Sequence, residues 1–469
     1  MATMPALPAG AEDYDTSDGF DEAFEAPGVV REHYLEVLES LAETGVEHAA
    51  QAVEARLREW SVRFGGEGDG AEFVVDPVPR LLTAEEWKEL TTGLRQRVLA
   101  LDAFVADMHG PRRAIADGVI PARVVEGSVY LEDDLRGLEP VGGARIAIAG
   151  LDVVRDRDGR FKVLEDNVRT PSGSAYGLAA SEAVEAAVPT HARHEAAAEW
   201  LRTALRHCME ATNPDVEGEL VLLTDGPGNS AWYEHKRLAE VADLRLVQPD
   251  ELRRRGGRLE VVDGAPVRAV YRRTDEDRVR DEDGQLTYLA ELLLEPLRSG
   301  TIGLVNWFGN GVADDKRVYP YVDDLVRLYL GEEPHLTSVP TYDLVDETAR
   351  AEVLDRLGEL VLKPRDGHGG TGVTFGPTAS AAVLEEARAT VRADPGGWIA
   401  QDPVLLSTHP TVVGDRLEPR HVDLRPFAFC DGGKVTVAPG GLTRVALTAG
   451  SMIVNSSRQG GGKATWVLT

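Results

Sequence analysis

The chain has 469 residues, 43% hydrophobic and 28% charged, which is long enough for two or three globular domains. Its formal net charge of −29 argues against a nucleic-acid partner, because a phosphate backbone is bound by a basic surface. Only two cysteines, Cys208 and Cys430, are present and no run of about 18 apolar residues occurs, which excludes a disulfide framework, a cysteine metal site and a membrane span. With no basic residue before Arg31, we expect a cytoplasmic protein, and its oligomeric state stays open.

The N-terminal part is predicted to be an acidic tail followed by helices. Residues 1–27 carry seven acidic residues and no basic one, which predicts a disordered tail. Residues 28–140 are expected to be a helical region, since apolar residues recur at helical spacing over 29–60. Thr83 and Glu86 form a capping box that begins a second, longer helix.

The next segment contains the most informative motif, a predicted β-hairpin. Two apolar runs flank Asp158 and Gly159, and with these two residues as the loop Asp152 pairs with Glu165. Two carboxylates opposite each other are destabilising by themselves, and Asn167 points to the same face. Two carboxylates and a carboxamide suit Mg²⁺, with phosphates as its remaining ligands. The alternative is a solvated hairpin whose polar side chains face outward.

A β/α alternation follows an Ala-rich helical stretch. Strands are predicted at 219–224, 244–247 and 267–271, and helices at 233–241 and 285–298. This pattern is typical of a parallel sheet, so residues 215–300 are interpreted as an α/β substrate-side domain. Arg272 and Arg273 end one of the strands, where ligand crevices often form. They would hold a substrate carboxylate or form salt bridges with Asp275 or Asp277.

A glycine-rich loop follows a lysine in the last third of the chain. A strand ends at Lys363 and runs into a loop that contains Gly369, Gly370 and Gly372, after which another short strand is expected. The loop lacks the Gly-Lys-Ser/Thr of a Walker A motif, but a glycine-rich hairpin can also place backbone N–H groups over phosphates. An ordinary turn is the alternative. A lysine at the end of a buried strand needs a partner, and a phosphate would serve.

Two further segments near the C-terminus carry polar groups. Gln401-Asp402-Pro403-Val404 interrupts a strand, which frees main-chain groups to bind the edge of a base; an ordinary edge strand is the alternative. Arg425 lies in the middle of a strand, and Arg444 follows in a glycine-rich stretch. A buried arginine pairs with a carboxylate or a phosphate, so Arg425 binds a ligand or forms an internal salt bridge with Asp423 or another acid.

The order of these motifs resembles the nucleotide half of an ATP-grasp enzyme. The sequence Asp-Asp-Lys316, the Lys363 strand with its glycine loop and the segment 398–404 follow one another as in that superfamily. In most ATP-grasp chains the acidic metal motif comes after these elements, whereas here it comes before them. This order is similar to the circularly permuted ATP-grasp proteins related to glutathionylspermidine synthetase, type 2 branch. Phrases such as Arg420-His-Val-Asp-Leu-Arg-Pro-Phe strengthen the resemblance, which covers about residues 70–469.

The resemblance implies a mixed α/β (α+β) protein with a circularly permuted ATP-grasp core, a βα substrate-side domain and a helical N-terminal region. The metal-binding part would span 141–214 and the nucleotide-binding region 301–469. The implied cofactors are ATP and Mg²⁺. The implied activity is an ADP-forming carboxylate–amine ligase that joins a small-molecule or peptide carboxylate to an amine through an acyl phosphate. An ATP-dependent phosphotransferase without an amine step, and a nucleotide-binding scaffold without turnover, are the alternatives.

The resemblance also implies roles for individual residues. The metal ligands would be Asp152, Glu165 and Asn167. The ATP-binding residues would be Lys316, Lys363, Gly369, Gly370, Gly372, Gln401, Asp402 and Val404. The related synthetases carry an arginine two residues before the first metal aspartate, where this chain has Gly150. The positive charge of that missing arginine would come from Arg155, Arg169, Arg425 or Arg444, of which the last three are the predicted catalytic residues.

Overall fold

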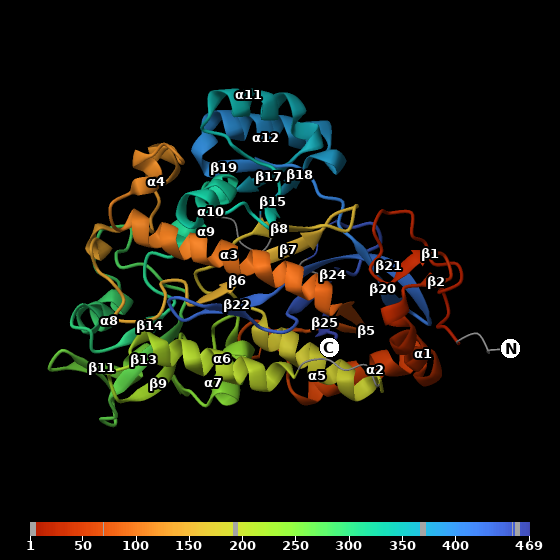
Figure 1. Ribbon diagram of the computed structural model, residues 1–469, viewed down its shortest axis with the longest axis horizontal. Coiled ribbons are helices and arrows are strands. Elements are labelled where there is room, and N and C mark those ends of the chain that lie inside the picture. The colour runs from red at the N-terminus through yellow and green to blue at the C-terminus, as the bar shows by residue number, and fades with distance from the viewer. Residues whose placement is uncertain (1–5, 69, 191–195, 366–371, 453, 455–459) are drawn as a thin grey trace.

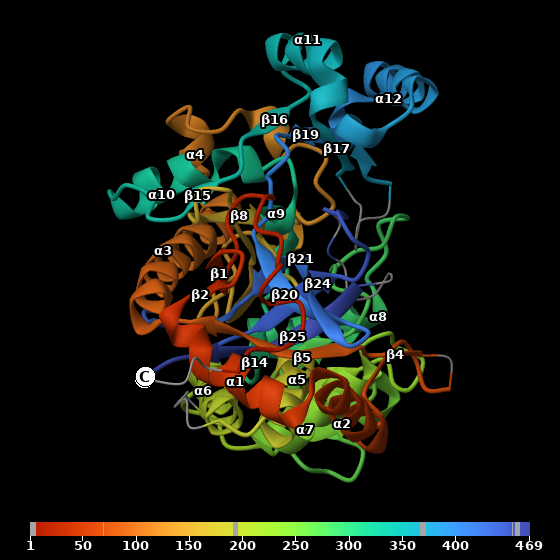
Figure 2. The same ribbon diagram turned by 90° about the vertical axis from the view of Figure 1, so that its right-hand side faces the viewer.

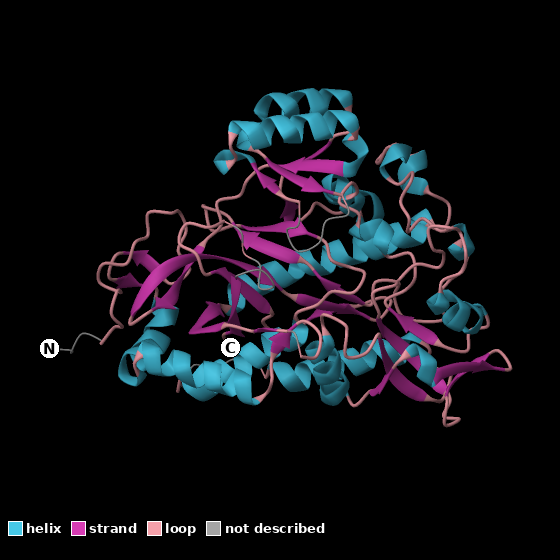
Figure 3. Ribbon diagram, turned by 180° about the vertical axis from the view of Figure 1, so that it is seen from behind, coloured by secondary structure: helices cyan, strands magenta, loops and turns pink. Residues whose placement is uncertain are grey.

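The computed structural model describes residues 6–68, 70–190, 196–365, 372–452, 454 and 460–469. A large central sheet, a parallel sheet and a small antiparallel sheet form its main layers (Figure 1). Seen from behind, helices lie at the top and bottom of the molecule and most strands lie between them (Figure 3). This arrangement confirms the predicted mixed α/β class. Among the described residues, no helix is both long and apolar enough to cross a bilayer.

The central sheet has the strand order β15-β8-β7-β21-β24-β25-β5, and β20 pairs with β21 beside it. Its strands are β5 (Val75–Leu82), β7 (Asp152–Arg155), β8 (Phe161–Glu165), β15 (Thr337–Ser338), β20 (Thr408–Val413), β21 (Arg416–Arg425), β24 (Leu442–Ala446) and β25 (Gly460–Val467). The first and last of these strands in the chain, β5 and β25, pair in parallel at one edge (Figure 2). Two strands almost 400 residues apart in the sequence are therefore neighbours in the same sheet.

Strand β5 lies within the region that was expected to be helical. All eight of its residues are buried, although its sequence, Val-Asp-Pro-Val-Pro-Arg-Leu-Leu, contains two prolines and two charges. Proline has no N–H group to donate to a neighbouring strand, so a segment with two prolines is not recognised as a strand from its sequence. The charged groups have buried partners: Asp76 pairs with Lys463 of β25, and Arg80 pairs with Glu22. The prediction of a helical region over 28–140 is therefore only partly right.

The predicted hairpin of β7 and β8 is present, but its loop is one residue longer than expected. The amide of Asp156 donates to the carbonyl of Arg160 at 2.9 Å, which leaves a three-residue loop with Gly159 at φ +79°. The predicted two-residue loop is therefore wrong, because the left-handed glycine ends a three-residue turn. A β-bulge further along compensates for the shift and pairs Asp152 with Glu165, as predicted.

The parallel sheet has the order β10-β9-β13-β14, and all its pairings are parallel, which confirms the predicted β/α alternation. Its elements are β9 (Glu219–Thr224), α7 (Trp232–Ala242), β10 (Arg245–Val247), β13 (Val267–Arg273), α8 (Tyr288–Arg298) and β14 (Gly303–Val305). Apolar clusters cover both faces, as such a sheet requires. The fourth strand, β14, lies beyond the predicted boundary at residue 300, and the chain runs from it toward Lys316.

The small sheet, with the order β16-β19-β17-β18, carries two helices on its outer face, at the top of Figure 1. Its elements are β16 (Thr341–Asp343), α11 (Glu347–Arg356), β17 (Val361–Pro364), β18 (Thr374–Phe375), α12 (Ala381–Ala393) and β19 (Trp398–Gln401). It has its own apolar core, centred on Leu357 and Leu362. Strands β17 and β18 flank the glycine-rich loop, as predicted; Gly369 and Gly370 lie outside the described residues.

The acidic N-terminal segment packs against the rest of the protein from residue 6 onward, so the predicted disordered tail over 1–27 is wrong for its described part. Tyr14 and Phe24 stack with ring centroids 4.2 Å apart, and both are buried. The Asp21 carboxylate accepts hydrogen bonds from Tyr14 and from Thr408 of β20. Glu22 is 2% exposed and pairs with arginines of β5 and β7. These acidic residues are therefore buried and hold the segment in place, because residues distant in the sequence pair with them.

Long helices cover both faces of the central sheet. The capping box at Thr83 and Glu86 is confirmed and begins α3 (Ala84–Met108). The other helices are α1 (Leu35–Thr44), α2 (Val46–Glu59), α4 (Arg113–Ala116), α5 (Ser174–Ala187), α6 (Ala197–Thr212), α9 (Gly311–Asp314) and α10 (Val322–Leu330). The remaining strands are β1 (Phe24–Ala26), β2 (Val29–Val30), β3 (Arg63–Phe64), β4 (Ala71–Glu72), β6 (Ile148–Gly150), β11 (Leu252–Arg255), β12 (Arg258–Val261), β22 (Phe427–Cys430) and β23 (Val435–Val437). Helix α3 packs against β22 and β23 and shares an apolar core with Val153 and Val163 of the central sheet, whereas α5 packs against β24 and β25.

Candidate functional site

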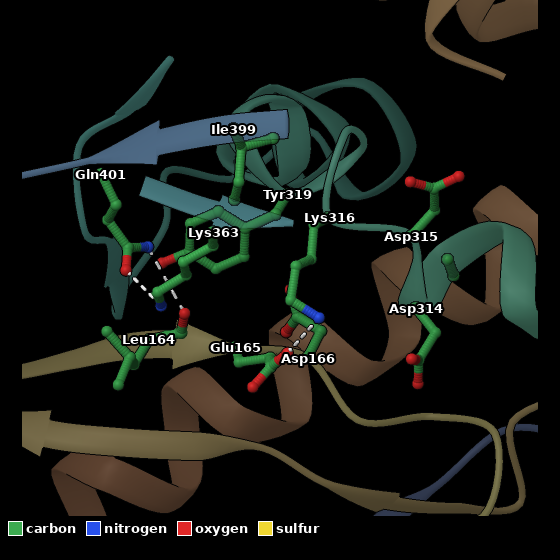
Figure 4. Close-up of a pocket in the computed structure, with 11 residues that line it drawn as sticks. Leu164, Glu165, Asp166, Asp314, Asp315, Lys316, Tyr319, Lys363, Ile399 and Gln401 are labelled. Atoms are coloured by element: carbon green, nitrogen blue, oxygen red, sulfur yellow. Dashed lines mark hydrogen bonds and ion pairs between the residues drawn. The ribbon is translucent and has the colours of Figure 1, made fainter. Parts of the chain in front are cut away.

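A pocket lies where the central sheet meets the small sheet (Figure 4). Its walls come from the end of β8, from α9 and the loop after it, and from β17 and β19. The lining residues are Leu164, Glu165, Asp166, Ala313, Asp314, Asp315, Lys316, Tyr319, Lys363, Ile399 and Gln401. Four of the predicted site residues, Glu165, Lys316, Lys363 and Gln401, are thereby brought together from segments up to 236 residues apart in the sequence.

Lys316 and Glu165 form an ion pair on the pocket wall. The Nζ atom of Lys316 lies 2.8 Å from Oε1 of Glu165, and the two side chains point toward each other in Figure 4. Burial disfavours both charges, but the attraction between the two groups outweighs it. The pKa of Lys316 is therefore raised and the pKa of Glu165 is lowered. Both groups are ionised at neutral pH, as a phosphate contact and a metal ligand require.

Lys363 has a neutral partner. Its Nζ donates to Oε1 of Gln401 at 2.6 Å, and Nε2 of Gln401 donates to Oγ1 of Thr341 at 3.0 Å. Within the described part of the chain, no ion pair involves Lys363, and burial lowers its pKa. A buried ammonium that lacks a carboxylate partner is stabilised by an anion entering the pocket.

A row of charges crosses the central sheet beside the pocket. Strand β21 pairs with β7 at Leu424 and Val153, so the next residues along, Arg425 and Asp152, lie directly opposite each other. Arg425 binds Asp152 with two parallel hydrogen bonds, Nε to Oδ1 at 2.6 Å and Nη2 to Oδ2 at 2.9 Å. Since Glu165 is opposite Asp152 on the other side, three neighbouring strands place Glu165, Asp152 and Arg425 in line.

Arg444 extends this row on the next strand. It lies opposite Asp423 in the β21–β24 register, donates to it, and also places Nη2 2.9 Å from Oδ2 of Asp152. Burial works against the charge of Asp152, but Arg425 and Arg444 together lower its pKa. The internal salt bridge that was the alternative for Arg425 is present, but its acid is Asp152, whereas Asp423 is bound by Arg444. Two of the three predicted catalytic arginines, Arg425 and Arg444, therefore lie beside the predicted metal ligand Asp152.

The predicted metal ligands have a donor set that fits a hard cation. Asp152 and Glu165 are adjacent carboxylates with lowered pKa values, so both carry the charge that a metal requires. Asn167 is half-buried, and its buried Nδ2 has no hydrogen-bond partner among the described residues. This leaves an N–H donor for an anionic ligand, while a cation would take the Oδ1 atom of the same amide. In the described part of the chain, no three His, Cys, Asp or Glu side chains are grouped as a metal site. The predicted set contains only two such residues, and the amide would be its third member.

Arg169, the third predicted catalytic arginine, lies on the side of the parallel sheet. Its Nε donates to Oδ2 of Asp277 at 2.6 Å, and its guanidinium lies over the ring of Tyr130, 4.5 Å from the centroid. Arg272, next to it, is 1% exposed, and its Nε and Nη1 have no hydrogen-bond partner among the described residues. The carboxylate of Asp277 is 3.9 Å from Nη1 of Arg272 and is already bound by Arg169. Arg273, by contrast, is paired with Glu234 at 2.8 Å.

Gly150 lies where the related synthetases have an arginine, and the structure leaves no room for a side chain there. A Cβ atom at this position would be 2.8 Å from Cβ of Pro171, 3.1 Å from Phe427 and 3.4 Å from Cδ of Arg425. The stem of Arg425 thus fills the space beside Gly150. Of the arginines considered from the sequence, Arg425 is the one that passes through this space.

The remaining predicted ATP-binding residues do not line the pocket or lie outside the described residues. The amide of Asp402 donates to the carbonyl of Pro340 at 2.9 Å, and the Val404 side chain packs on a small apolar cluster. Gly372, at φ +75°, lies next to Pro364. The sequence did not single out Asp315, whose carboxylate accepts from Nε of Arg365 at 2.9 Å and so ties the start of the glycine loop to the Lys316 segment. The only signal for it was its place in the Asp-Asp-Lys316 motif.

Comparisons with known proteins agree with this geometry. A relative from Mycobacterium tuberculosis, itself uncharacterized, is 41% identical over 97% of this chain and 86% of its own length. A Frankia casuarinae protein named provisionally as a glutamate–cysteine ligase is 40% identical over 96% of this chain, which matches 54% of that protein. The solved structure of an apo glutathione synthetase-like effector from Globodera pallida aligns with a TM-score of 0.57, covering 90% of this chain and 97% of that one at 11% identity. At that identity, the likeness concerns the fold alone.

The family match covers most of the chain. The model of the family described as circularly permuted ATP-grasp type 2 matches residues 79–446, from the end of β5 to the end of β24. Within this range the strands with Asp152 and Glu165 precede the segments with Lys316 and Lys363, which is the permuted order expected from the sequence. The chain therefore belongs to the circularly permuted ATP-grasp type 2 family.

Proposed function

We propose that the protein is an ATP- and Mg²⁺-dependent ligase that joins a carboxylate to an amine through an acyl phosphate, with release of ADP. The observation that carries this proposal is the convergence of Glu165, Lys316 and Lys363 on one pocket, directly beside Asp152 and Arg425. Family membership and the ligase-like name of the Frankia relative support the same class of reaction. The Frankia relative is matched over only 54% of its length, so its substrates are not assigned to this chain.

In this proposal the two lysines bind the phosphates of ATP from opposite walls of the pocket. Lys316 comes from the loop after α9, below the small sheet, and Lys363 comes from the sheet itself. Gln401, hydrogen-bonded to Lys363, holds that ammonium toward the pocket. The adenine would lie near Asp402 and Val404, where β19 ends. Gly369, Gly370 and Gly372 belong to the loop that would cover the phosphates.

Asp152, Glu165 and Asn167 would hold Mg²⁺. The bound ion would neutralise charge on the phosphates during transfer, which is the main requirement of phosphoryl transfer. The chain itself keeps both carboxylates ionised, because Arg425 and Arg444 flank Asp152 and Lys316 flanks Glu165. It also orients them, since the sheet register fixes their relative positions.

The acid substrate is proposed to lie on the side of the parallel sheet, near Arg272. This guanidinium is buried at the carboxyl end of β13, where open α/β sheets bind ligands, and two of its N–H-bearing nitrogens lack partners among the described residues. An anionic group of the acid would supply those hydrogen bonds. Arg169 lies two residues after the metal ligand Asn167 and pairs with Asp277, so it connects this region to the pocket.

The proposed reaction has two steps. An oxygen of the acid carboxylate attacks the γ-phosphorus of ATP, the bond from that phosphorus to the bridging oxygen breaks, and ADP leaves. The amine nitrogen then attacks the acyl carbon and loses a proton as inorganic phosphate leaves. Arg425, which occupies the space beside Gly150, would stabilise the charge that develops on the transferring and acyl oxygens.

An assay of the full chain with ATP, Mg²⁺ and panels of acids and amines tests the proposal. We expect ADP and phosphate to be released only when an acid is present, and an amide product to form when an amine is added. Phosphorylation of a product without any requirement for an amine would indicate a phosphotransferase. ATP binding without turnover across the panels would indicate a scaffold. Either of these outcomes would overturn the ligase.

A further inference from the structure

Three polar side chains, spaced four residues apart, hold the backbone that follows the proposed metal ligands. The Nδ2 of Asn306 donates to the carbonyls of Val168 and Arg169, both at 3.1 Å. The Nδ2 of Asn310 donates to the carbonyl of Val168 at 3.3 Å. The Oδ2 of Asp314 accepts from the amides of Val168 at 2.7 Å and Arg169 at 3.2 Å. All four backbone polar groups of this dipeptide are thus bound by side chains of one segment, the 306–314 clamp.

The clamp is buried and is tied to the rest of the core. Asn306 and Asn310 are each 1% exposed. Asn306 also exchanges two hydrogen bonds with the backbone of Ile148 in β6, and Asn310 donates to the carbonyl of Arg145 at 2.7 Å. Leaving a buried backbone group unpaired is unfavourable, so the Val168–Arg169 backbone has one strongly preferred position.

The clamp also joins three parts of the site. The segment begins directly after β14 of the parallel sheet, and Lys316 follows Asp314 by two residues. The backbone that the clamp holds begins at Val168, which directly follows Asn167 in the chain. The proposed metal ligand and the phosphate-binding lysine are therefore held to each other by side chain–backbone hydrogen bonds, independently of the Lys316–Glu165 ion pair.

We propose that Asn306, Asn310 and Asp314 are positioning residues that set Asn167 at the metal and fix its distance to Lys316. This inference rests on the proposed function, because it assigns the clamp its role through Mg²⁺. Outer residues that orient metal ligands commonly change metal affinity about 10–100-fold when they are altered. A role limited to folding would instead lower stability and leave the Mg²⁺ dependence of the folded protein unchanged.

The test measures binding instead of turnover. The full chain is titrated with the non-hydrolysable ATP analogue AMP-PNP by calorimetry at a series of Mg²⁺ concentrations. In Asp314→Asn, which keeps the shape but replaces one acceptor oxygen by a donor, we expect half-saturation to need about 10–100-fold more Mg²⁺. Asn310→Ala is a milder change, and its half-saturation is expected to need about tenfold more Mg²⁺. This second variant replaces Asp314→Asn in the test if Asp314→Asn does not fold.

Asn213→Ala is the matched control. Asn213 is likewise 1% exposed and donates to a backbone carbonyl, that of Gly300 at 3.1 Å, but it lies outside the clamp. It should lose stability without a change in Mg²⁺ dependence. Clamp variants that fold and bind Mg²⁺ like the wild type would overturn the clamp alone. A wild-type protein whose AMP-PNP binding is absent or independent of Mg²⁺ would overturn the proposed function, and the clamp role with it.

Discussion

At the scale of single residues, the site depends on paired charges in a mostly dry environment. Asp152 is 3% exposed and would be unstable as an ion without Arg425 and Arg444. The same pairing that makes it stable in the fold keeps it ionised for a metal. Glu165 forms an ion pair with Lys316 and lines the pocket, and its side chain is 31% exposed against 4% for Asp152, so it is the more open of the two carboxylates to a ligand.

Glu165→Gln should lower Mg²⁺- and ATP-dependent activity about 10²–10³-fold while the fold survives, because the amide keeps the size of the side chain but loses the charge at the metal. Steady-state ADP release and thermal unfolding measure the two effects. Glu89→Gln, on the exposed face of α3, is the control and should leave both unchanged. Full activity in Glu165→Gln would remove this residue from the metal site.

Arg272→Met should raise the KM for the acid about tenfold or more and leave the KM for ATP unchanged, because only the acid is proposed to contact this guanidinium. Arg268→Met is the matched control: Arg268 belongs to the same strand but donates to the carbonyl of Asn213 near its other end. Steady-state kinetics with each substrate varied in turn distinguish the two variants. An unchanged KM for the acid in Arg272→Met would place the acid elsewhere.

At the scale of elements, the N-terminal segment acts as an anchor across the central sheet. Asp21 accepts hydrogen bonds from the amides of Ala23 and Phe24 and from two hydroxyl groups. Burial nevertheless dominates and raises its pKa to about 6. The native state therefore holds this proton more tightly than the unfolded chain does. The stability that Asp21 contributes is complete below about pH 4 and is lost as the pH rises through about 6.

Asp21→Asn removes this titration. Relative to the wild type, the free energy of unfolding of the variant should therefore increase between pH 4 and pH 7, by about 2 kcal/mol, since one unit of pKa corresponds to about 1.4 kcal/mol. Urea unfolding at pH 4, 5.5 and 7 measures the difference. Asp18→Asn, at an exposed position of the same segment, should show no such trend. A difference between Asp21→Asn and the wild type that stays constant with pH would contradict the expectation.

At the scale of the whole molecule, the pocket is divided between two sheets with separate cores. The central sheet supplies Glu165 and the small sheet supplies Lys363 and Gln401. A polar contact connects the two, since Nε2 of Gln401 in the small sheet donates to the carbonyl of Leu164 in the central sheet at 3.5 Å. A ligand that touches both walls should therefore stabilise the two sheets together.

Hydrogen exchange measures this coupling. With AMP-PNP and Mg²⁺, we expect slower amide exchange in β8 and in β17 at once, because the phosphates would contact residues of both strands. AMP without Mg²⁺ is the control and should protect less of β8. Protection confined to one of the two sheets would show that the nucleotide does not bridge them.

Local patterns in the sequence determined much of this fold. The capping box of α3, the parallel strands from Glu219 to Arg273 and the presence of the β7–β8 hairpin follow from short-range preferences and hydrophobic periodicity, whereas the pairing of Asp152 with Glu165 also needed a β-bulge. The order of the motifs was enough to indicate the permuted family, because it is a property of the chain and not of its folding.

Only the tertiary structure decided the rest, because the deciding partners are far apart in sequence. Glu22 is buried against Arg80, although the composition of residues 1–27 predicted a disordered tail. Strand β5 forms although its sequence contains two prolines. It also paired Arg425 with Asp152, 273 residues away, through the register of β21 and β7. Sheet register and burial are set by long-range packing, so no local pattern can encode which arginine neutralises which carboxylate.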